Sequence, residues 1–102
     1  MPPFDPLALR HGDFVLEAWS SIGDARISAQ TGVSSQAAAQ KLAQMRQLKS
    51  ELKVLRRSEI RRQDFPISEI NGWFEPLESS LSKAELFFAG RLAELKMEEI
   101  VH

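Results

Sequence analysis

The chain has 102 residues, of which 43% are hydrophobic and 26% charged, as in an ordinary soluble globular domain. It contains no cysteine, which excludes disulfides, thiolate nucleophiles and zinc–thiolate sites. The apolar runs are too short to span a membrane, and the first residues lack the basic and apolar segments of a signal peptide. We therefore expect a cytoplasmic protein without a membrane segment.

The net charge of −1 conceals a segregation of charge along the chain. Residues 46–62 hold seven basic and two acidic residues, whereas residues 63–102 hold three basic and eight acidic residues. This asymmetry indicates either a polyanionic partner for the basic segment or pairing between the two segments. The sequence leaves both interpretations open.

Short helices are expected at the start of the chain. Asp5, followed by proline, is typical of a helix start. Gly12 is expected to restart the chain, and Gly23 to end a second helix. A third short helix is expected over residues 24–31. We assign these helices to an N-terminal part, residues 1–34.

Two long helices are expected in the rest of the chain. Residues 35–62 lack Gly and Pro and are rich in strong helix formers. Pro66 breaks the chain, and a second helix is expected from Ser68 onward, kinked or split at Pro76. Apolar residues recur three and four positions apart along both segments, which is the spacing of a coiled-coil seam. The prediction is an all-α fold in which residues 35–102 form an antiparallel two-helix hairpin.

The hairpin offers one account of the basic segment. Charged residues of opposite sign directly follow seam positions on the two helices: Arg46, Lys49, Lys53 and Arg56 on the first, and Glu78 and Glu85 on the second. Flanking charges of opposite sign select partners in coiled coils. Pairing within the chain or across an oligomer would then neutralise much of the basic segment.

A helix-turn-helix-like pattern covers residues 26–42 and offers the other account. A short helix meets a turn at Gly32, and Ser34 or Ser35 caps the next helix. The start of that helix is the part of such a motif that contacts bases, and the basic segment behind it could follow a phosphate backbone. The candidate residues for binding double-stranded DNA are Arg26, Ser34, Ser35, Gln36, Gln40, Lys41, Arg46, Lys49, Lys53, Arg56, Arg57, Arg61 and Arg62.

Residues suited to catalysis are sparse. The histidines are His11 and His102, and no nucleophile, phosphate-loop or zinc motif is present. Glu98 and Glu99 precede His102 at a spacing that can bind a metal on a helix, but a frayed helix end accounts for them better. We expect no enzymatic activity, no metal and no cofactor.

Three phrases within residues 41–95 carry a family resemblance. They are Glu51-Leu52-Lys53-Val54-Leu55-Arg56-Arg57, the turn Asp64-Phe65-Pro66 followed by Ser68-Glu69-Ile70 and Trp73, and the later Phe87-Phe88-Ala89-Gly90-Arg91-Leu92. Together they resemble the small subunits of phage terminases of the lambda DNA-packaging type. The helix-turn-helix-like segment stands before them in the order that this family uses.

The resemblance implies a non-catalytic subunit in the host cytoplasm that binds viral DNA and oligomerises. It would deliver the DNA to a large terminase subunit that holds the ATPase and the nuclease. Oligomer or partner contacts are expected at apolar residues of both long helices: Leu48, Leu52, Leu55, Trp73, Leu77, Leu81, Phe87, Phe88 and Leu92. The residues alone also allow a helical adaptor, chaperone or inhibitor that has no nucleic-acid role.

Overall fold

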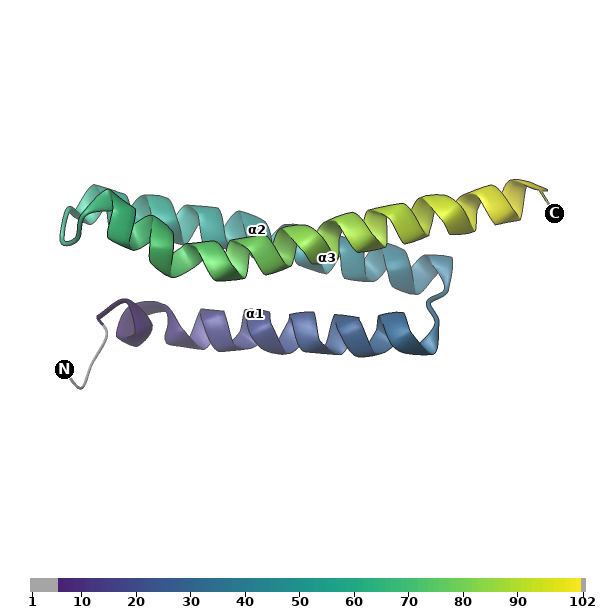
Figure 1. Ribbon diagram of the computed structural model, residues 1–102, viewed down its shortest axis with the longest axis horizontal. Helices are drawn as coiled ribbons and strands as arrows, with labels where there is room; N and C mark the ends of the chain where they lie inside the picture. Colours follow the sequence, from purple (N-terminus) through teal and green to yellow (C-terminus); the bar gives the residue numbers. More distant parts are fainter. Residues whose placement is uncertain (1–5, 102) are drawn as a thin grey trace.

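A computed structural model describes residues 6–101, apart from the side chains of residues 99 and 101. The expectations for Asp5 as a helix cap and for His102 as part of a frayed helix end lie outside these described parts. Three helices, α1 (Pro6–Thr31), α2 (Ser35–Arg62) and α3 (Ile67–Val101), make up nearly all of the described chain. They run side by side in an elongated body of 58 × 23 × 16 Å (Figure 1). The predicted all-α fold is confirmed.

The expectation of several short N-terminal helices is wrong, because α1 is one continuous helix of 26 residues. Gly12 and Gly23 lie inside it. A glycine inside a helix costs about 1 kcal/mol relative to alanine, which is too little to end a helix that packing supports. Ala18 and Ile22 are buried in the common core, and this packing keeps the helix intact across both glycines.

A tight corner joins α1 to α2. Gly32 has a φ of 95°, a left-handed conformation that glycine adopts at little cost. The Ser34 side chain accepts a hydrogen bond from the backbone N–H of Ala37 at 3.1 Å and caps α2. The helix-turn-helix-like segment is therefore the corner between two long helices, and the short helix expected over residues 24–31 is the last two turns of α1.

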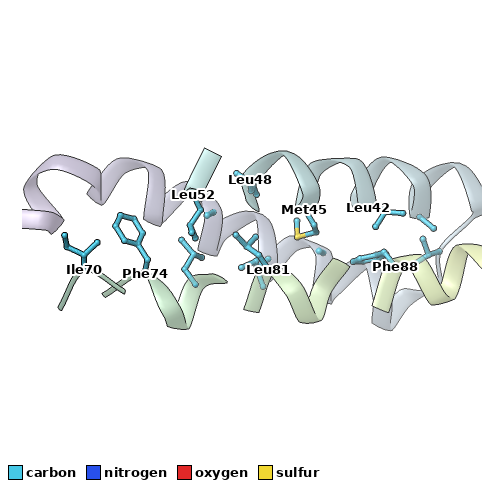
Figure 2. Close-up of a cluster of buried hydrophobic side chains, with 14 residues drawn as sticks. Leu42, Met45, Leu48, Leu52, Ile70, Phe74, Leu81 and Phe88 are labelled. Atoms are coloured by element: carbon cyan, nitrogen blue, oxygen red, sulfur yellow. The ribbon is translucent and has the colours of Figure 1, made fainter. Parts of the chain in front are cut away.

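The α2–α3 hairpin contains most of the core. The predicted seam positions of the two helices face each other, and Figure 2 shows Leu52, Met45 and Leu42 of α2 lying opposite residues of α3 such as Leu81 and Phe88. Both helices contribute buried side chains along the length that they share. The predicted antiparallel pairing of these two helices is present within one chain (Figure 1).

The hairpin turn lies close to its predicted position. Gln63 ends α2 in a left-handed conformation with a φ of 59°. The helix α3 begins at Ile67, one residue before the expected cap at Ser68, and the carbonyl of Pro66 accepts its first backbone hydrogen bonds. The helix runs through Pro76 without a split and curves along its length (Figure 1).

The helix α1 packs mainly against α3. Trp19 of α1 lies beside Trp73 and Pro76 of α3 around a shallow pocket. Near the other end of α1, Ala25 and Phe88 help to line a second groove between the two helices. The structure thus forms a three-helix bundle in which α1 covers one side of the hairpin.

Candidate nucleic-acid interface

The outer face of α2 carries an exposed stripe of mostly polar and basic residues. Its residues recur four and three positions apart, so they share one side of the helix, and all of them are exposed. We call this set the α2 outer stripe: Gln36, Gln40, Ala43, Gln47, Ser50, Val54, Arg57 and Arg61. It spans about 38 Å at about 1.5 Å per residue and contains no acidic residue.

Four of the seven cations in residues 46–62 are paired within the chain. Arg56 Nη1 lies 2.6 Å from Glu78 Oε2, and Lys49 Nζ lies 3.4 Å from Glu85 Oε2. Arg46 Nε approaches the other oxygen of Glu85 at 3.7 Å. These are the acidic partners that the hairpin pairing predicted, and the fourth cation, Arg62, pairs with Asp64.

The remaining three cations make no ion pair with any residue that the structure describes. Lys53, Arg57 and Arg61 are exposed and follow one another at intervals of four residues. Each step corresponds to about 6 Å along the helix axis. Arg57 and Arg61 flank a shallow hollow that Val54 and Ser58 also line. Arg57 and Arg61 belong to the α2 outer stripe and Lys53 lies beside it, so the three side chains form a positive ridge at the basic end of the stripe.

The candidate residues near the α1–α2 corner lie at the opposite end of α2. Gln36 and Gln40 are exposed and belong to the α2 outer stripe, whereas Ser35 and Lys41 are half-buried. The Ser34 hydroxyl oxygen is engaged in capping α2, as described above. Arg26 lines the groove between α1 and α3 instead. The structure therefore brings Gln36 and Gln40 onto one face with Arg57 and Arg61, and places Arg26 elsewhere.

Most of the expected interface residues fill the core of the single chain. Leu48, Leu52, Leu77, Leu81 and Phe88 are buried within one chain. Their side chains are therefore not available to a second copy, because the seam that suggested an oligomer is satisfied by the α2–α3 hairpin.

The other expected interface residues remain partly accessible. Leu55, Trp73 and Leu92 are partly buried against the core. Phe87 is 49% exposed and lines the groove between α1 and α3. Of the nine residues, Phe87 is the one that presents a large apolar surface to a partner.

A buried charged cluster was missed by the sequence reasoning. Glu59 of α2 is only 1% exposed, yet it is a carboxylate. Arg10 Nη1 donates to its Oε2 at 2.8 Å, and His11 Nε2 donates to its Oε1 at 2.7 Å. The residue follows Leu55 by four positions, so a charge at the next seam position was the signal that could have revealed it.

The same cluster extends to the hairpin turn. Asp64 Oδ2 accepts hydrogen bonds from Arg62 at 3.2 Å and from Arg10 at 3.0 Å. These two guanidinium groups, Arg62 first, hold the pKa of Asp64 below its usual value. Arg10 also lies over the ring of Phe65, 5.8 Å from its centroid. We call Arg10, His11 and Glu59 the α1 clamp, because they fasten the first turns of α1 to the hairpin.

The described residues contain no cluster of three or more His, Cys, Asp or Glu side chains arranged to hold a metal ion. Within the same residues, no helix combines the length and the apolar character needed to cross a bilayer. Comparison with protein-family models, with characterised proteins and with solved structures finds no match to this chain. The site must therefore be interpreted from its own residues.

Proposed function

We propose that this chain is a non-catalytic, oligomerising protein that binds double-stranded DNA along the α2 outer stripe. The observation that supports it most directly is the ridge of Lys53, Arg57 and Arg61, three exposed cations that form no ion pair with the described residues. A stripe with no carboxylate can lie along a phosphate backbone without repulsion from its own side chains. Gln36 and Gln40 provide neutral donors and acceptors for phosphates or base edges, whereas Gln47 donates to the exposed carboxylate of Glu51 beside the stripe at 3.1 Å.

The resemblance over residues 41–95 supports a more specific role. As a terminase small subunit, the protein would bind viral DNA near the packaging start in the host cytoplasm. It would then present that DNA to a large subunit that holds the ATPase and the nuclease. This role needs only binding and assembly from the present chain.

The ridge sets the expected strength of binding. Three phosphate contacts release about three counterions, which gives a slope of about −2.7 in log K against log salt. Binding should then weaken about 40-fold between 50 and 200 mM salt. If the paired cations Arg46, Lys49, Arg56 and Arg62 also took part, the slope would be more than twice as steep.

Fluorescence anisotropy with a labelled 20-base-pair duplex tests the proposal. The substitution pair Arg57→Gln with Arg61→Gln should lower the salt slope to about one third and abolish measurable binding at 150 mM salt. The matched control is Arg91→Gln with Lys96→Gln, which removes two positive charges from α3 and should leave the slope unchanged. Equal losses in both pairs would mean that total charge, and not the α2 outer stripe, governs binding.

A helical adaptor is the second candidate function, and two observations favour it. The internal pairs to Glu78 and Glu85 neutralise part of the basic segment. The outer face of α1 exposes Leu9, Leu16 and Ile27 to solvent. If the duplex does not bind even at 50 mM salt, DNA binding is refuted and this protein-binding role becomes the better proposal.

A further inference from the structure

The C-terminal half of α3 carries a second apolar seam on the face turned away from α2. Leu86, Gly90, Ala93, Met97 and Ile100 are separated by four, three, four and three residues, which is the heptad spacing of a coiled coil. Leu86 is 74% exposed, Met97 63% and Ile100 81%. We call these five residues the α3 outer seam. It lies roughly opposite the inner positions Phe88 and Leu95 on the helix.

The middle of this seam is small and open. A Cβ atom added at Gly90 would meet no atom within 4 Å, and Ala93 is exposed. Gly90 lies inside a 35-residue helix, as Gly12 and Gly23 lie inside α1, and costs about 1 kcal/mol relative to alanine. Small residues at a helix crossing let two backbones approach closely.

The end of α3 is also free of the rest of the bundle. Figure 1 shows its last turns extending past the corner between α1 and α2. A second helix can therefore lie along the α3 outer seam without meeting α1 or α2 over these turns.

The charges beside the seam complement each other when two copies run in opposite directions. Near its start, Lys83 and Arg26 line the apolar groove beside Phe87, and neither makes an ion pair with a residue that the structure describes. Near its end, Glu98 is exposed without an ion pair to any described residue, whereas Glu94, also exposed, is already paired with Arg91 at 3.1 Å. A parallel arrangement places like charges side by side, whereas an antiparallel arrangement brings each acidic end to the basic groove of the other copy.

We propose that two copies of this chain form an antiparallel dimer through the α3 outer seam. Heptad geometry places Leu86 opposite Met97 of the second copy, and Gly90 opposite Ala93. In this register Lys83 lies opposite Ile100 of the second copy, beside its acidic last turns. The proposal deepens the oligomerising part of the proposed function and rests on that part alone.

The dimer differs from the assembly that the sequence suggested. The inner seam, with Leu77 and Leu81, is used within the chain, so the two copies meet on the opposite face of the same helix. Because α2 is not part of the contact, both copies keep their α2 outer stripes exposed. A dimer can then present two positive ridges to one duplex.

Sedimentation equilibrium across a hundredfold range of concentration tests the dimer. The chain should approach twice its monomer mass of 11.5 kDa at the highest concentrations. The substitution Ala93→Glu should weaken association at least 100-fold. In the proposed register it would bury one carboxylate from each copy in the contact, each against Gly90 of the opposite copy. Ala39→Glu, at an exposed alanine of α2, is the matched control and should associate like the parent chain.

The helical content of both variants should stay unchanged by circular dichroism, since neither alanine is buried in the chain. A monomer at every concentration would overturn the proposal. Continued dimerisation of the Ala93→Glu variant would also overturn it, since the contact would then lie on another face. DNA binding is measured separately, so its failure would leave the result on the dimer intact.

Cross-linking tests the orientation, and the absence of cysteine from the sequence makes it direct. A variant with both Leu86→Cys and Met97→Cys should be joined into covalent dimers by a short bismaleimide. Each single variant should not, because identical positions lie about 16 Å apart in the proposed register, eleven residues at about 1.5 Å each. Efficient linking of the single variants would overturn the antiparallel register.

Discussion

Substitution of Glu59 by glutamine provides the most informative test of the fold. The carboxylate is buried and accepts charge-assisted hydrogen bonds from Arg10 and His11 at 2.8 and 2.7 Å. Each such bond contributes about 1.5–3 kcal/mol. Glutamine keeps the size of the side chain but loses the charge, and one of its two terminal atoms becomes a donor that faces another donor.

The loss is partly offset because Arg10 retains Asp64 as a partner at 3.0 Å. We therefore expect Glu59→Gln to lower the free energy of unfolding by about 3 kcal/mol. In a domain of this size, that change corresponds to a fall in Tm of roughly 12–24 °C. Urea denaturation followed by circular dichroism measures the free energy, and thermal denaturation measures the Tm.

The location of the effect is as informative as its size. Because the α1 clamp joins α1 to the hairpin, hydrogen exchange should accelerate about 100-fold in the first half of α1 and much less in the α2–α3 core. Glu51→Gln, at an exposed position of α2, the helix that also carries Glu59, is the control and should change the free energy of unfolding by less than about 0.5 kcal/mol. If Glu59→Gln behaves like this control, the α1 clamp does not hold α1.

Three further predictions concern the core, the turn and pH. Phe74→Ala should lower the free energy of unfolding, measured by urea denaturation, by about 3–5 kcal/mol because Phe74 is fully buried. The control Leu9→Ala, at an exposed position, should lower it by less than about 0.5 kcal/mol. Similar losses in the two variants would refute the assigned core. Gln63→Gly should raise the unfolding free energy by about 0.5–1 kcal/mol, because Gln63 has a positive φ, and a loss of stability would contradict this reasoning. The pKa of Asp64 is lowered in the folded protein, so its carboxylate stabilises the fold above the ordinary aspartate pKa, and this stabilisation is lost as the pH falls through the lowered value. Asp64→Asn should therefore flatten the dependence of Tm on pH below about 4. An unchanged profile would refute the contribution.

The long helices could be predicted from sequence because their signals are local. Residues 35–62 combine good helix formers with a regular apolar spacing, and both point to the same structure. The turn is similarly specified, since Pro66 forbids a simple continuation of the helix. The salt bridges from α2 to Glu78 and Glu85 could be predicted once the hairpin was assumed, because these charged residues directly follow seam positions on the two helices.

The continuity of α1 could not be predicted in the same way. Gly12 and Gly23 are local signals for a break, but tertiary packing decides whether a break occurs. The α1 clamp depends on contacts between residues 48 and 49 positions apart, and no spacing rule connects them. For the candidate interface, the sequence listed the cations of residues 46–62 together, whereas only the fold separates those paired internally from Lys53, Arg57 and Arg61.

The dependence of α1 on α3 has a consequence for synthesis on the ribosome. The buried face of α1, including Ala18 and Ile22, is complete long before its partner Phe88 is made. At about 5–20 residues per second, the ribosome needs roughly 3–11 s to add residues 32–88. During that interval the nascent α1 exposes an apolar face on a helix weakened by Gly12 and Gly23. The stable packing of α1 therefore has to wait until α3 has been synthesised.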